Sequence, residues 1–128
     1  MSVEDIFVST FIIPERQSRY IELLSSSEKR RKILDRLNHS FDIVESLSTE
    51  VPRDVCSLAL LQSRGAPSLC HVIADSHPLD GCENTLSEAV EELEGHMFGY
   101  VIICVPDRLA LYQPECPSNA LLLERSWD

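Results

Sequence analysis

The sequence predicts an α+β domain in which an N-terminal layer of about four helices precedes a mixed four-stranded sheet with one crossover helix. Helical periodicity of apolar residues dominates the first half of the chain, and apolar β-branched runs dominate the second half. One more helix signal separates the first two strand signals. With 128 residues, the chain suits a single domain over residues 1–128, because this length buries a core without disulfides or a metal.

Cap residues and a proline define the first three predicted helices. A first helix is expected after Ser2, because apolar residues recur at i, i+4 and i+8 up to Phe11. Pro14 ends this helix and suits the first position of a second helix, over residues 15–25. A second capping pattern then predicts a third helix over residues 29–38.

The middle of the chain predicts a loop and then a fourth helix. Residues 39–52 lack a clear period and are interpreted as a loop that ends in breakers. Residues 52–64 are predicted to be helical, because Pro52 suits the first turn and Gly65 with Pro67 forms a stop signal.

The first strand, the crossover helix and the second strand are predicted next. Residues 69–74 form an apolar strand signal. Residues 85–94 form a helix signal with a capping pattern from Thr85 to Glu88. If this helix is a right-handed crossover, the strands at 69–74 and 99–105 are parallel.

A hairpin follows, and it is the strongest strand signal in the chain. The run from Tyr100 to Val105 is apolar throughout, which predicts a central strand covered on both faces. A Pro-Asp turn leads into a second strand ending at Gln113, and residues 120–124 predict a last strand. An edge strand at 120–125 would allow pairing across a dimer, so we expect a monomer or a homodimer.

Charge and hydropathy exclude two classes of partner. The chain has 11 Lys and Arg against 21 Asp and Glu, for a net charge of −10. Residues 41–128 hold four of the basic and fifteen of the acidic residues. We therefore expect no nucleic-acid partner, because phosphate binding needs clustered cations. No apolar run approaches a membrane span and acidic residues replace a basic leader, so we expect no membrane insertion and no signal peptide.

The cysteines indicate a reducing compartment. There are five, widely spaced and without a CxxC pair, which is not a disulfide framework. We expect a cytoplasmic protein in which Cys56 and Cys104 are small buried hydrophobes.

The loop at 75–82 is the first candidate site. It contains Asp75, His77, Asp80 and Cys82, residue types that ligate divalent metals or supply an acid and a base. It would leave the carboxyl end of a parallel strand and lead into a helix N-terminus, where ligands and anions bind. The competing interpretation is a tight loop, since Asp, Ser, Pro and Gly are ordinary turn residues.

Two related hypotheses use neighbouring residues. Cys70, His71, His77, Cys82 and His96 would form a zinc site if the loop folded over the strand ends, although their spacing is unlike the paired ligands of zinc motifs. Cys82 with His77 would form a thiol dyad, but no nucleophile elbow supports it. We expect no bound cofactor.

Two charged helix faces complete the candidates. Glu88, Glu91 and Glu92 share one face of the helix at 85–94, a pattern of an ordinary solvated face or of a surface for a basic protein partner. The basic run at 29–32 lies among acidic residues and is interpreted as a solvated face of mixed charge.

Three short stretches resemble small bacterial proteins of about 130 residues and unknown function. They are Gly65-Ala-Pro with Cys70 to Ile73, Leu79-Asp-Gly81, and Cys104-Val-Pro-Asp-Arg-Leu-Ala110. The resemblance implies a bacterial cytosolic protein and implies no activity. The leading hypothesis is a non-enzymatic binding or regulatory module that acts through a protein interface. The alternative is a small metal- or ligand-binding enzyme with its site in the 75–82 loop.

Overall fold

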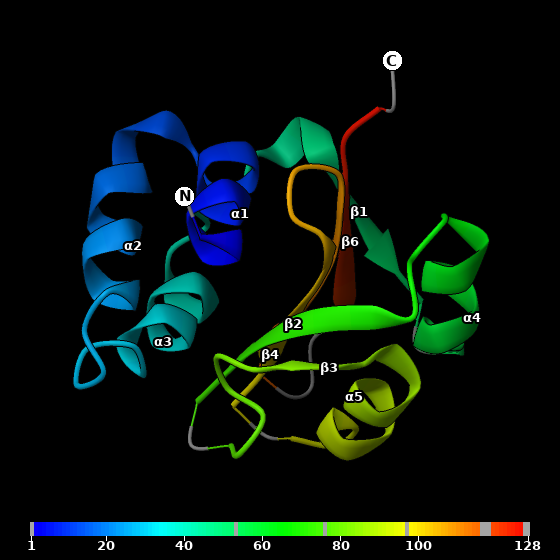
Figure 1. Ribbon diagram of the computed structural model, residues 1–128. Helices are drawn as coiled ribbons and strands as arrows, with labels where there is room; N and C mark the ends of the chain where they lie inside the picture. Colours follow the sequence, from blue (N-terminus) through cyan, green and yellow to red (C-terminus); the bar gives the residue numbers. More distant parts are fainter. Residues whose placement is uncertain (1, 53, 76, 97, 116–118, 127–128) are drawn as a thin grey trace.

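A six-stranded antiparallel sheet lies at the centre of the molecule, with helices on both of its faces (Figure 1). The computed structural model describes residues 2–52, 54–75, 77–96, 98–115 and 119–126. The helices are α1 (Val3–Phe11), α2 (Gln17–Leu24), α3 (Lys32–His39), α4 (Ser57–Ser63) and α5 (Leu86–Leu93), with short 3₁₀ turns η1 (Pro14–Arg16) and η2 (Glu45–Leu47). The strands are β1 (Ser48–Val51), β2 (Leu69–Ala74), β3 (Glu83–Thr85), β4 (Tyr100–Val105), β5 (Leu109–Gln113) and β6 (Ala120–Glu124).

The α+β class is confirmed, but the predicted mixed four-stranded sheet is wrong. The strand order is β1-β6-β5-β4-β2-β3, and each neighbouring pair is antiparallel. The predicted hairpin is confirmed as β4 and β5, with β4 inside the sheet and buried on both faces. Strands β1 and β3 account for the two additional members.

Strand β3 explains why β2 and β4 are antiparallel rather than parallel. It reverses the chain after the 75–82 loop, so that Thr85 lies opposite Leu69 at the start of β2. Helix α5 then returns along the sheet, and β4 begins at Tyr100, opposite Ala74 at the end of β2. The connection between β2 and β4 therefore consists of a strand and a helix rather than a helix alone. The additional reversal of chain direction makes β4 antiparallel to β2.

Strand β1 lies in the segment that was expected to be a loop. Its residues pair with β6, with Ser48 opposite Leu123 and Val51 opposite Ala120. It is four residues long and mostly polar, so its sequence lacks the alternation that marks a strand. Strand β6 therefore lies inside the sheet, and the predicted edge strand at 120–125 is wrong. Oligomeric state stays a prediction.

The helices divide between the two faces of the sheet, so the predicted single layer of about four helices is also wrong. Helices α1, α2 and α3 cover one face, where their apolar side chains pack against alternate strand residues such as Ile73, Val101 and Tyr112. Helices α4 and α5 cover the other face, against residues such as Val72 and Ile102. Burial on both faces accounts for the continuous apolar runs of β4 and β5.

The sequence predicted some helix ends correctly and others incorrectly. The capping box of Ser2 with Asp5 at the start of α1 is confirmed. Helix α3 begins at Lys32, because residues 26–31 form turns. Helix α4 begins at Ser57 and leaves Cys56 exposed rather than buried, whereas Cys104 is buried as expected. Among the described residues, no helix is long and apolar enough to cross a bilayer.

Asp42 is a buried charge that closes the layer formed by α1, α2 and α3. Its carboxylate accepts a hydrogen bond of 2.7 Å from the hydroxyl of Tyr20, and its backbone oxygen accepts one of 2.8 Å from the amide of Ile13. The guanidinium groups of Arg16 and Arg36 lie 3.9 and 3.6 Å from the carboxylate oxygens. The carboxylate is thereby compensated by one hydroxyl and two cations.

Gly99 is required by the close approach of the backbone before β4 to the end of β5. It has φ +84°, and an added Cβ would lie 2.5 Å from the backbone oxygen of Gln113. Gly99→Ala should lower the free energy of unfolding by about 3 kcal/mol, measured by urea denaturation. Gly65→Ala is the control, since Gly65 has φ +92° but open space around it, and should cost about 1 kcal/mol. An equal loss of unfolding free energy in the two variants would show that the close approach to Gln113 adds no cost beyond that of the positive φ.

Candidate functional site

The 75–82 loop connects β2 to β3, which changes its surroundings from those expected. Helix α5 begins after Thr85, at the opposite end of β2, so the loop does not lead into a helix N-terminus. The end of α5 lies near the loop instead, where the imidazole Nε2 of His96 lies 2.8 Å from the backbone oxygen of Asp75. The anion-binding geometry expected from a parallel strand and a following helix is therefore wrong.

Asp80 is occupied by contacts within the chain. One carboxylate oxygen accepts a hydrogen bond of 2.9 Å from the backbone amide of Ala74. The two oxygens also accept bonds of 3.1 and 3.0 Å from Nε and Nη2 of Arg30. This bidentate arrangement fixes the carboxylate in position and shapes the loop around it.

Arg30 connects Asp80 to the first turn of α1. Its Nη1 and Nη2 donate bonds of 2.6 and 2.8 Å to the two carboxylate oxygens of Glu4. On the far side of Glu4, Nε2 of His71 lies 2.8 Å from the carboxylate. The side chains of Arg30, Glu4 and Asp80 are only 17%, 12% and 26% exposed. We call Glu4, Arg30, His71 and Asp80 the Arg30 cluster.

The Arg30 cluster controls the ionisation of Glu4. Burial by itself would raise the pKa of this carboxyl, but hydrogen bonds from His71 and Arg30 and the positive charge of Arg30 outweigh burial and lower its pKa to about 2. Two carboxylates flank the guanidinium, and their hydrogen bonds raise the pKa of Arg30 despite its partial burial. The cluster thus holds Glu4 and Arg30 in their charged forms.

The interpretation of residues 29–32 as a solvated face is wrong at Arg30. Lys29, Arg31 and Lys32 are exposed, but Arg30 turns inward toward α1 and the loop. Nothing in the local sequence separates Arg30 from its basic neighbours. Sequence reasoning therefore missed Glu4, Arg30 and His71 as partners of Asp80, because their contacts join segments that lie far apart in the chain.

The other candidate residues of the loop lie near α5 rather than in the Arg30 cluster. The rings of His77 and His96 meet edge to face, with centroids 5.2 Å apart. Nδ1 of His77 accepts a hydrogen bond of 3.1 Å from the amide of Leu79, so the remaining proton of the neutral ring lies on Nε2. Cys82 is exposed, and its sulfur lies 3.5 Å from the backbone oxygen of Asp80.

The structure brings few of the proposed metal ligands together. His71 belongs to the Arg30 cluster, and Cys70 lies in the core of the α5 face. His77 meets His96, but Nδ1 of His77 is already engaged by the amide of Leu79. Within residues 2–52, 54–75, 77–96, 98–115 and 119–126, no group of three or more His, Cys, Asp or Glu side chains is placed to hold a metal ion.

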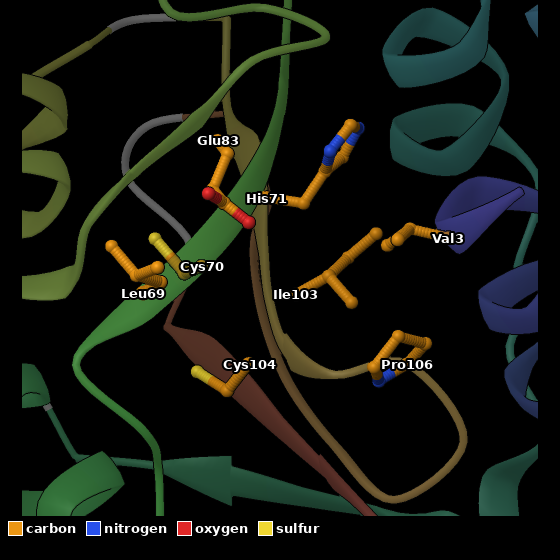
Figure 2. A pocket seen from close by; sticks show the side chains of 8 residues that line it. All are labelled: Val3, Leu69, Cys70, His71, Glu83, Ile103, Cys104 and Pro106. Atoms are coloured by element: carbon orange, nitrogen blue, oxygen red, sulfur yellow. The ribbon is translucent and has the colours of Figure 1, made fainter.

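A small hollow opens near the start of β2, beside the Arg30 cluster (Figure 2). Its volume is about 160 Å³, enough for a few water molecules. Residues from α1, β2, β3 and β4 and from the turn after β4 line it: Val3, Leu69, Cys70, His71, Glu83, Ile103, Cys104 and Pro106. The hollow is too small for a drug-sized ligand.

The glutamates of α5 lie on its outer face, as expected. Leu86, Ala89 and Leu93 are buried against the sheet, whereas Glu88, Glu91 and Glu92 are exposed. Among ion pairs between described residues, none involves these three carboxylates. As far as the described residues go, the outer face of α5 is therefore an acidic surface without a paired cation, and we call it the α5 surface.

Comparisons with known proteins add no further constraint. No protein-family model, no curated protein and no solved structure matches this chain. The resemblance to small bacterial proteins of unknown function accordingly stays a prediction.

Replacing Arg30 tests whether the Arg30 cluster stabilises the fold. Arg30→Ala leaves the carboxylates of Glu4 and Asp80 partly buried without their shared cation, so the free energy of unfolding should fall by about 2–4 kcal/mol. Arg31→Ala is the matched control, because Arg31 is the exposed neighbour, and it should change stability by less than about 0.5 kcal/mol. Urea denaturation measures both, and similar effects in the two variants would contradict the role given to Arg30.

The lowered pKa of Glu4 predicts a loss of stability in acid. Its pKa rises from about 2 in the folded protein to 4.5 when the chain unfolds, so its contribution is present above pH 4.5 and is lost as the pH falls toward 2. Denaturation curves between these pH values should show a steeper loss in the natural protein than in Glu4→Gln. The difference should be on the order of 2 kcal/mol. Parallel curves would mean that Glu4 is not held in its charged form.

Proposed function

We propose that the protein is a non-enzymatic binding or regulatory module that acts through a protein interface, with the α5 surface as its contact for a basic partner. The observation that carries this proposal is the exposure of Glu88, Glu91 and Glu92 on one helix face, without an ion pair to another described residue. Such a face attracts a positively charged protein surface and speeds the encounter with it.

Several other carboxylates of the chain, unlike the three glutamates of α5, form ion pairs within the molecule. Glu4 and Asp80 share Arg30, and Asp42 lies between Arg16 and Arg36. These charges are neutralised within the molecule, so their role in stability is evident from their contacts. The three glutamates of α5 make no such contact with another described residue, whereas Leu86, Ala89 and Leu93, with Val90 beside them, pack this helix on the sheet.

The rigid seating of α5 favours an interface on this helix. Its buried residues belong to the core that also contains β2, β4 and β5, and its flanks contact α4 and β3. Side chains on a packed helix keep fixed spacing, which reduces the ordering cost of binding. A basic partner would therefore meet three carboxylates that are already in position.

The proposal places the protein in the bacterial cytoplasm. The free thiols of Cys56, Cys70, Cys82 and Cys104 support a reducing compartment. The net charge of −10 supports a protein partner over nucleic acid. We propose a monomer or a homodimer as the acting form.

The alternative is a small metal- or ligand-binding enzyme that uses Asp75, His77, Asp80 and Cys82. The contact between His77 and His96 favours this alternative, because two imidazoles lie side by side at one end of α5. Against it, Asp80 is engaged by Arg30 and Ala74, and Nδ1 of His77 is engaged by Leu79. These contacts leave few free donor atoms in the loop.

Charge reversal of the α5 surface should abolish binding to the partner. The triple variant Glu88→Lys, Glu91→Lys and Glu92→Lys should lose, by at least about tenfold, a protein that the natural chain retains from bacterial lysate and that is identified by mass spectrometry. Retention by the natural chain should also weaken as salt is added, because exposed charges are screened.

Two controls separate this surface from net charge and from the loop. Reversal of Glu15, Glu28 and Glu45 makes the same change in net charge on other exposed positions and should leave retention unchanged. His77→Ala should also leave it unchanged. Retention that survives the α5 reversal but is lost in His77→Ala would contradict the proposal and favour the loop.

A further inference from the structure

Cys70 and Cys104 lie one residue beyond the last residues that pair β2 with its antiparallel neighbour β4. The register of β2 and β4 pairs His71 with Ile103 and Val72 with Ile102. Continued by one residue toward the start of β2, the same register places Cys70 opposite Cys104. Both cysteines belong to the core on the α5 face, so their side chains leave the sheet on the same side.

The hydrogen bonds of β2 show which type of cross-strand pair the two cysteines form. The amide of Val72 donates to the oxygen of Cys82, and the oxygen of Val72 accepts from the amide of Gly81. Both backbone groups of Val72 therefore point away from β4. Backbone groups two residues apart in a strand point the same way, so those of Cys70 also point away from β4. Cys70 and Cys104 are accordingly a non-hydrogen-bonded pair.

This type of pair has the closest side chains in an antiparallel sheet. Its Cα atoms are about 4.5 Å apart, within the range of about 4.4–6.8 Å that disulfides span. The register between β4 and β5 shifts between Ile103 and Val105, which places an irregularity at Cys104. Strand β4 is therefore bent locally at Cys104.

Both cysteines are buried, and both lie beside the hollow near the start of β2. Cys70 and Cys104 both line the hollow of about 160 Å³, and Figure 2 shows their side chains on the opposite side of the sheet from Val3 and Pro106. Leu69, which is exposed, lies beside them at the rim. The hollow is too small to admit glutathione, so the exchange requires local opening of the sheet beside it.

We propose that Cys70 and Cys104 are a modification site that closes to a cross-strand disulfide by exchange with a low-molecular-weight disulfide such as oxidised glutathione. One protein thiolate attacks a sulfur of the reagent, forms a mixed disulfide and releases one thiolate of the reagent. The second protein thiolate then attacks the protein sulfur of the mixed disulfide and releases the other. The two cysteines together lose two electrons and two protons, and the reagent is reduced to two thiols.

Burial makes these steps slow. It raises the pKa of Cys70 to about 11 and that of Cys104 to about 12, with added repulsion from Glu83 on Cys70 and from Cys70 on Cys104. Thiolates are therefore scarce at neutral pH, and the exchange is slower than at the exposed Cys56 and Cys82.

The test uses the complete folded protein and oxidised glutathione. Samples are quenched in acid at intervals, the remaining thiols are alkylated, and the digested protein is analysed by mass spectrometry. Cys56 and Cys82 should gain glutathione first, and a peptide pair joined through Cys70 and Cys104 should appear later and disappear on reduction. In Cys104→Ser, Cys70 should not enter this linkage.

Three results would overturn the inference. The first is that Cys70 and Cys104 both stay free thiols, and so are alkylated after the quench, when Cys56 and Cys82 have reacted completely. Another is stable glutathione on Cys70 or Cys104 without closure to the pair. The third is a disulfide from either residue to a different cysteine. The inference does not depend on the α5 surface, so it stands or falls separately from the proposed function.

Discussion

The guanidinium of Arg30, held between the carboxylates of Glu4 and Asp80, constrains how the helical layer meets the sheet. A charge removed from water must find opposite charges and hydrogen-bond partners in place, or the fold loses several kcal/mol. Arg30 satisfies this requirement only when the start of α1, the turn before α3 and the β2–β3 loop are all correctly positioned. His71 extends the same requirement to β2. One side chain thus specifies the relative placement of four segments.

Apolar patterning predicted much of the fold, because it reports burial directly. The hairpin of β4 and β5, strand β2 and helix α5 were all predicted from local apolar runs, since both faces of the sheet are covered. The capping box predicted from Thr85 to Glu88 is wrong, because the side chain of Thr85 makes no capping hydrogen bond. Strand β3 was missed because it is three residues long and follows a loop of turn residues. That omission changed the topology, since a three-residue reversal decides whether β4 runs parallel or antiparallel to β2.

The candidate site was less predictable than the fold, because its contacts join distant parts of the chain. The loop residues were found from their chemistry, but Arg30 lies 50 residues before Asp80, and Glu4 lies 67 before His71. No periodic pattern in the sequence predicts contacts between residues so far apart in the chain. The acidic face of α5 was predictable, since a helical period places Glu88, Glu91 and Glu92 opposite the buried Leu86, Ala89 and Leu93. The Arg30 cluster therefore stabilises the fold, whereas the acidic face of α5 is the surface that we propose for binding.

Arg30 couples segments that lie far apart in the chain. Hydrogen exchange of the Asp80→Asn variant measures this coupling most directly. Compared with the natural protein, the variant should exchange faster in the 77–82 loop, in the turn at 26–31 and in the first turn of α1 together, while β5 and β6 keep their protection. Faster exchange confined to the loop, with the turn and α1 unchanged, would contradict it.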